Sequence, residues 1–76
     1  MVYHFDYRHN GALIRDDEGT ALVSLDQARK EAVRALVEFA KDEVQAWEAS
    51  QLAIEVRESG QLVLQVVLTV EIKQFR

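Results

Sequence analysis

The fold of this chain is decided by residues 52–72, which read LAIEVRESGQLVLQVVLTVEI. Over residues 52–57, large apolar side chains (Leu52, Ile54 and Val56) alternate with Ala53, Glu55 and Arg57, which is the two-residue period of a strand with one buried face. Residues 58–61 (ESGQ) are typical of a tight turn. The alternation then resumes from Leu62 to about Phe75, with every second residue from Leu62 to Ile72 apolar. We therefore predict a hairpin of two strands that share one buried face.

The N-terminal segment alternates in the same way. Its aromatic face carries Tyr3, Phe5 and Tyr7, and its other face carries Val2, His4, Asp6 and Arg8. Asn10-Gly11 follows, and because both residues tolerate positive φ, the pair indicates a second hairpin. The chain is expected to return as a strand over residues 12–15, to turn at residues 16–19 (DDEG) and to continue as an extended connection over residues 20–23. We predict that the aromatic face points inward and that the polar face meets water.

Between the two hairpins, the sequence predicts a helix over residues 25–47. Ser24 and Gln27 have the spacing of a capping box, in which the hydroxyl accepts from the Gln27 N–H and the amide reaches back. Apolar residues then keep a stripe on one helical face. The stripe consists of Leu25, Ala28, Ala32, Val33, Leu36, Phe39, Ala40, Val44 and Trp47. We expect Trp47 to close the core, with the anchoring of a partner as the alternative.

The element order is therefore β-β-α-β-β, which predicts a single α+β domain over residues 1–76. One long helix would pack on one face of a mostly antiparallel four-stranded sheet. The strand order stays open at this point. Arrangements that keep both hairpins paired place either the first and third strands or the first and fourth strands in the centre.

The composition excludes several classes of protein. Nine basic against thirteen acidic side chains give a net charge of −4, which argues against binding of nucleic acid through its phosphates. The absence of cysteine excludes disulfides, thiolate nucleophiles and cysteine metal sites. No apolar run approaches the roughly 20 residues of a membrane span, and the N-terminus lacks the pattern of a signal peptide. We therefore expect a cytoplasmic protein without membrane contact.

Few residues suggest chemistry. His4 and Asp6 share a strand face and His9 follows nearby, so the three could ligate a metal or act as a general base, although they lack HxH or HExxH spacing. Residues 16–19 match only the opening of a calcium loop. The chain has no glycine-rich phosphate loop and no serine in a nucleophile elbow. We expect no catalytic residue, no cofactor and no metal, and hence no enzyme.

The last predicted strand carries the strongest hint of function. Residues 62–70 have no charged side chain, and Val63 and Val67 make the second face partly apolar. The strand is either central, or it is an exposed edge that a second copy covers, because edge strands are usually blunted by proline, bulges or charge. We favour self-association as a homodimer. The candidate residues are Val63, Gln65, Val67 and Thr69.

The chain resembles a family of short bacterial proteins classed as a domain of unknown function. The resemblance rests on turn and core residues spread over nearly the whole chain. They are Tyr3, Phe5, Asn10-Gly11, Asp17-Glu18-Gly19, Ala28, Glu31, Ala32, Ile54, Val56, Glu58, Gly60, Leu64 and Val66. The family often has Asp at position 58 and a glycine in the helix exit, where this chain has Ala49-Ser50-Gln51. The resemblance implies the β-β-α-β-β arrangement and no known activity; the pattern is also loosely similar to the sheet domain of HicB-type antitoxins.

These observations favour a homodimeric interaction or regulatory module without chemistry of its own, with a further protein partner as a possibility. One alternative is an antitoxin-like protein that binds a toxin or nucleic acid. Its basic contacts would come from Arg8, Arg15, Arg29, Lys30 and Arg34. The other alternative is a metal-dependent activity that uses His4, Asp6 and His9.

Overall fold

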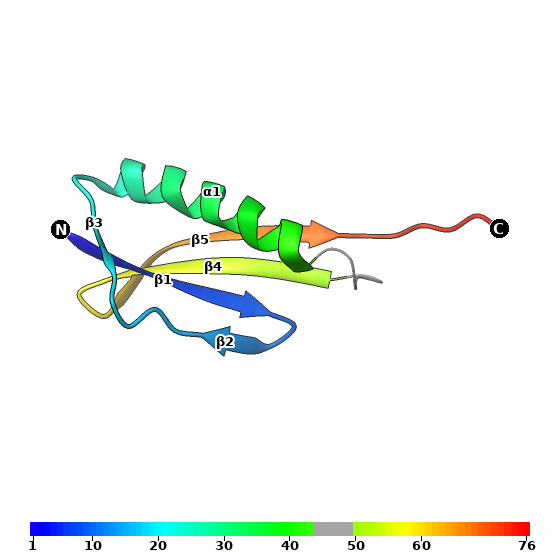
Figure 1. Ribbon diagram of the computed structural model, residues 1–76, viewed down its shortest axis with the longest axis horizontal. Coiled ribbons are helices and arrows are strands. Elements are labelled where there is room, and N and C mark those ends of the chain that lie inside the picture. Colours follow the sequence, from blue (N-terminus) through cyan, green and yellow to red (C-terminus); the bar gives the residue numbers. More distant parts are fainter. Residues whose placement is uncertain (44–49) are drawn as a thin grey trace.

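The computed structural model describes residues 1–43 and 50–76. Its elements are β1 (Val2–His9), β2 (Ala12–Ile14), β3 (Thr20–Ala21), α1 (Leu25–Glu43), β4 (Ser50–Glu58) and β5 (Gln61–Val70). Figure 1 shows α1 lying along one face of the strands. The predicted α+β class and element order are confirmed. The short strand β3 is an addition, because part of the expected extended connection pairs with the start of β1.

The sheet has the order β2-β1-β4-β5, with β3 also on β1. All four strand pairings are antiparallel. Of the two arrangements left open by the sequence, the structure has the one with the first and third predicted strands, β1 and β4, in the centre. The last strand, β5, is therefore an edge strand of the described sheet.

Both hairpin turns use the same backbone conformation. Asn10 and Gly11 have φ of 49° and 85°, and Ser59 and Gly60 have φ of 51° and 78°. Two successive residues with positive φ match the right-handed twist of the flanking strands. The predicted turns are confirmed, and they align β1 with β2 and β4 with β5.

The core lies between α1 and the sheet. Its buried apolar residues are Tyr3, Phe5, Ala28, Ala32, Leu36, Leu52, Ile54 and Val56. The aromatic face of β1 thus points inward, as predicted. The helix packs chiefly over β4 and β5, where the two buried alanines allow a close approach. Two members of the predicted stripe, Leu25 and Val33, are each 46% exposed, because the buried stripe of α1 is narrower than predicted.

The helix begins as the capping box predicts. The Gln27 N–H donates to Ser24 Oγ at 3.1 Å. The Gln27 side-chain oxygen accepts from the N–H of Val23 at 3.0 Å, one residue further back than expected. The helix reaches Glu43, and the predicted end at Trp47 lies outside the described residues. Within residues 1–43 and 50–76, no helix has the length and apolar character to cross a membrane.

Three strand predictions need correction. Strand β2 ends at Ile14 rather than Arg15. Strand β5 ends at Val70 rather than near Phe75, because Val70 pairs with Ser50, the first residue of its neighbour β4. A register shift next to Arg57 places Leu62 opposite that arginine. Leu62 is consequently 58% exposed instead of lying on the buried face.

Candidate functional site

The structure separates the three residues of the predicted metal site. His4 and Asp6 lie on the sheet face that α1 does not cover. His9 lies on the opposite face, where its ring approaches that of Phe39 (6.1 Å between centroids) and its Nδ1 is 3.5 Å from Glu43 Oε2. Among the described residues, no group of three or more His, Asp or Glu side chains could hold a metal ion. The grouping of His4, Asp6 and His9 is therefore wrong.

Asp6 contradicts the expectation of a water-facing strand face, because it is only 2% exposed. Its carboxylate accepts from Arg57 Nε at 2.6 Å and from Arg57 Nη2 at 3.1 Å. It also accepts from the N–H of Asp16 at 3.0 Å. The hydrogen bonds from Arg57 lower the pKa of Asp6, and the opposing effect of burial is smaller. The outer face of the sheet thus contains a buried ion pair that joins β1 to β4.

Asp16 fixes the loop between β2 and β3 onto the edge of β1. Its Oδ2 accepts from the N–H of Phe5 at 3.0 Å. This backbone donor of β1 lies between the stretches of β1 that pair with β2 and with β3. Its Oδ1 accepts from the N–H groups of Glu18 and Gly19, at 3.1 and 3.0 Å. Burial tends to raise the pKa of Asp16, but these three N–H groups together lower it. The predicted turn is present, but its first acid is an internal acceptor rather than a solvated charge.

The packing of this loop on β1 explains the glycine at position 19 and the contact made by His4. Gly19 has a φ of 77°, and a Cβ on it would lie 2.7 Å from Cγ1 of Val2. Only glycine fits this left-handed position against the outer face of β1. The carbonyl oxygen of Asp16 lies 3.0 Å from His4 Nδ1 and accepts from Arg57 Nη2 at 3.2 Å. His4 and Arg57 therefore hold the loop and are not free to bind a ligand through these atoms.

We expect acid to destabilise the fold through these two carboxyl groups. Asp6 and Asp16 both have lowered pKa values in the folded protein, so their stabilisation is present above the unfolded value of about 3.9. It is lost as the pH falls through the folded values. The free energy of unfolding, measured in urea, should be nearly constant from pH 7 to about 5 and fall below about pH 4. Asp6→Asn should flatten this dependence, and Asp17→Asn, in the exposed part of the same turn, should leave it unchanged.

The predicted self-association residues lie on the outer face of β5, beside the open edge of the sheet. Val63 is 38% and Val67 is 49% exposed. The two polar members bond to β4: Gln65 Nε2 donates to Glu55 Oε2 at 3.0 Å, and Thr69 Oγ1 accepts from Gln51 Nε2 at 3.3 Å. On the outer face, these two side chains are therefore already paired with residues of β4. What remains available for self-association is the backbone edge of β5 rather than its outer face.

Two exposed valines form a short apolar strip on α1. Val33 and Val37 are 46% and 50% exposed and lie one helical turn apart. The opposite flank of α1, with Ala35, lines a pocket over β1 and β2. Because successive helical residues are rotated by about 100°, Val33 lies on the flank toward β5, and Val37 lies further round the helix, toward solvent. The apolar periodicity of the helix predicts Val33 as part of the buried stripe, so it does not reveal this exposed strip.

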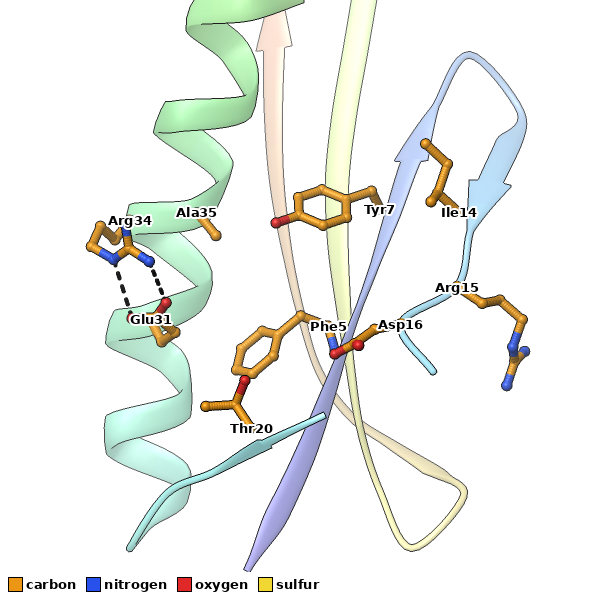
Figure 2. A pocket seen from close by; sticks show the side chains of 9 residues that line it. All are labelled: Phe5, Tyr7, Ile14, Arg15, Asp16, Thr20, Glu31, Arg34 and Ala35. Atoms are coloured by element: carbon orange, nitrogen blue, oxygen red, sulfur yellow. Dashed lines mark hydrogen bonds and ion pairs between the residues drawn. The ribbon is translucent and has the colours of Figure 1, made fainter. Parts of the chain in front are cut away.

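A pocket of about 370 Å³ opens between α1 and the inner face of β1 and β2 (Figure 2). It exists because the helix packs over β4 and β5 and leaves β1 partly uncovered. Its lining consists of Phe5, Tyr7, Ile14, Arg15, Asp16, Thr20, Glu31, Arg34 and Ala35. The residues come from three separate segments, so no local pattern could have predicted it.

The basic residues of the antitoxin-like alternative do not form a free patch. Arg8 pairs with Glu55 at 2.9 Å, and Arg34 pairs with Glu31. Asp26 binds both Arg29 and Lys30, at 3.0 and 3.3 Å. Arg15 alone among the five makes no ion pair within the described part of the chain. The structure therefore gives no observation in favour of phosphate binding.

Comparison with known proteins adds a family and no activity. We found no significant match among curated proteins or among solved structures. A family model described as a domain of unknown function, DUF6894, matches residues 2–69. This range includes α1 and nearly all of the sheet. The resemblance noted in the sequence is therefore confirmed at the level of an uncharacterised family, and the likeness to HicB-type antitoxins stays a prediction. The chain belongs to the DUF6894 family of domains of unknown function.

Proposed function

We propose that this protein is a non-catalytic interaction module that forms a homodimer through the edge of β5. The two copies would pair their β5 strands antiparallel about a two-fold axis and so extend the sheet. This assigns the predicted self-association residues a place beside the pairing edge. It also leaves the inner core of each copy unchanged.

The observation that carries this proposal is the contrast between the two sides of the sheet. On the β1 side, two strands of three and two residues and the carboxylate of Asp16 occupy the edge. On the other side, β5 offers ten consecutive residues without a charge or a proline. Very short edge strands and charged side chains prevent unwanted pairing, and β5 has neither. A bulge can also protect an edge, but the register shift beside Arg57 affects only the first residues of β5 and leaves residues 64–70 in regular pairing. Natural edges of this length are usually covered.

The apolar strip on α1 supports a second copy as the occupant. Antiparallel pairing of two β5 strands brings the two helices side by side on the same face of the extended sheet. Val33 and Val37 of each copy would then approach those of the other. A domain of this size has a small core, which rarely supplies more than about 3–5 kcal/mol, so covering this strip would add needed stability.

The test is the mass of the protein in solution. We expect light scattering coupled to gel filtration to give a dimer at about 100 µM, which corresponds to a modest affinity. Val67→Lys should convert it to a monomer, because each copy would bring a like charge to the paired edge. Val37→Lys should weaken the dimer through the helix strip.

The matched control is Val23→Lys, because Val23 is 80% exposed and precedes the helix, away from β5. It should leave the dimer intact. A wild-type monomer at several hundred micromolar would end the proposal. A dimer that survives both Val67→Lys and Val37→Lys would place the interface elsewhere and equally contradict it.

A further inference from the structure

The pocket between α1 and β1 has an uneven supply of hydrogen-bonding groups. Its two acids are already occupied: both oxygens of Glu31 accept from Arg34, and both oxygens of Asp16 accept backbone N–H groups. Its donors are not. Arg34 uses only Nε and Nη2 on Glu31, which leaves Nη1 without a partner among the described residues. Both acids are thus paired within the protein, whereas Nη1 of Arg34 stays available to a ligand.

A second donor lines the same pocket as Arg34. The Tyr7 hydroxyl makes no hydrogen bond to any described residue, and Figure 2 shows it directed toward α1 at Ala35. The Tyr7 ring is held by an edge contact with Phe39, with centroids 4.9 Å apart. Glu31 raises the pKa of Arg34, and Glu38 and Tyr7 add to this effect, which is consistent with the phenol lying near the guanidinium. Arg15 projects away from the helix in Figure 2 and is therefore not one of these donors.

The apolar part of the pocket is of limited size. Phe5 and Ala35 form its inner wall, and Ile14, which is 59% exposed, forms part of its rim. The volume of about 370 Å³ falls at the lower end of the range for sites that bind small molecules. Such sites combine apolar walls with a few convergent polar groups. Here the donors without a partner among the described residues are Arg34 Nη1 and the Tyr7 hydroxyl, and both residues line the pocket.

We propose that this pocket binds a small aromatic carboxylate. The carboxylate accepts hydrogen bonds from Arg34 Nη1 and from the Tyr7 hydroxyl, and the ring lies against Phe5, Ile14 and Ala35. Arginine is well suited to this role, because its guanidinium can bind one carboxylate through Nε and Nη2 and present its remaining N–H groups to another. The site lies on the β1 side of the helix, away from β5, and so is independent of the dimer.

Phenylacetate is the probe, and ¹H–¹⁵N NMR spectra of the full chain are the readout. We expect saturable shifts with a Kd of a few millimolar or below, as for a ligand of this size. The shifts should centre on Tyr7, Ile14 and residues 31–35. Benzylamine, which replaces the carboxylate by an ammonium group, should bind at least about tenfold more weakly. No saturation by about 20 mM phenylacetate, or equal binding of both probes, would overturn the proposal.

Two variants and one control test the assigned donors. Arg34→Gln should weaken phenylacetate binding about tenfold, and Tyr7→Phe, which keeps the ring, should weaken it several-fold. Arg29→Gln removes a helix arginine that pairs with Asp26 outside the pocket, and it should leave the Kd unchanged. Unchanged binding in Arg34→Gln would overturn the assignment. The Val67→Lys variant should bind as wild type does, and a loss of binding there would contradict a site within one copy.

Discussion

Asp6→Ala is expected to lower the free energy of unfolding by about 3 kcal/mol, which is the lower end of the cost of breaking a buried ion pair. The variant leaves Arg57 without its carboxylate, although the arginine side chain is only 17% exposed. The N–H of Asp16 loses its acceptor as well. A loss of this size approaches the whole stability that a small core supplies, about 3–5 kcal/mol. Urea unfolding followed by circular dichroism at 25 °C should therefore find only about 0–2 kcal/mol of stability left in the variant.

The double variant separates the ion pair from simple packing. Asp6→Leu combined with Arg57→Met replaces both charges by apolar groups, and such replacements are often neutral or stabilising. We expect the double variant to recover most of the lost stability, whereas Asp17→Ala, at an exposed acid of the same loop, should change stability by less than about 0.5 kcal/mol. If Asp6→Ala were as stable as wild type, the ion pair would not be holding the loop and sheet together.

This ion pair also marks the boundary of what the sequence could predict. The hairpins, the helix start and the inward aromatic face follow from local patterns, namely two-residue alternation, Asn10-Gly11 and the Ser24 cap. The burial of Asp6 depends on Arg57, which lies 51 residues away and becomes its neighbour only when β1 pairs with β4. Two strand orders were compatible with the hairpins, so the partner could not be chosen. An alternating pattern shows only that an acidic residue lies on the outer face of a strand. It is the same whether the carboxylate meets water or is buried in an ion pair.

The candidate sites divide in the same way. The uncharged run in β5 was visible in the sequence, and the structure places it at an edge. The pocket and the strip of Val33 and Val37 could not be predicted from the sequence, because both depend on which strands the helix packs against. Ala28 and Ala32 are fully buried and set the helix close over β4 and β5. A periodic stripe predicts that a helix packs, but it does not predict which strands it covers.

The second large effect is expected from Ile54→Ala, which should cost about 4 kcal/mol. Ile54 is 0% exposed in the central strand β4, between β1 and β5, so truncation leaves a cavity that the neighbours cannot fill. Val66 is its partner in register on β5 and is only half-buried. Val66→Ala should cost about 1 kcal/mol in dilute protein, because part of the valine already meets water. Urea unfolding of both variants at about 1 µM measures the difference.

Measuring both variants again at high protein concentration tests whether a second copy covers the inner face of β5. Ile54 is already buried within one copy, so the stability lost in Ile54→Ala should be the same at about 1 µM and 200 µM. Val66 lies beside the proposed interface, and pairing through β5 would cover the rest of its side chain. The cost of Val66→Ala should therefore rise to about 2 kcal/mol or more in concentrated protein, while wild-type stability also rises by mass action. Pairing at this edge would be contradicted if neither the stability lost in Val66→Ala nor the stability of the wild type changed with protein concentration.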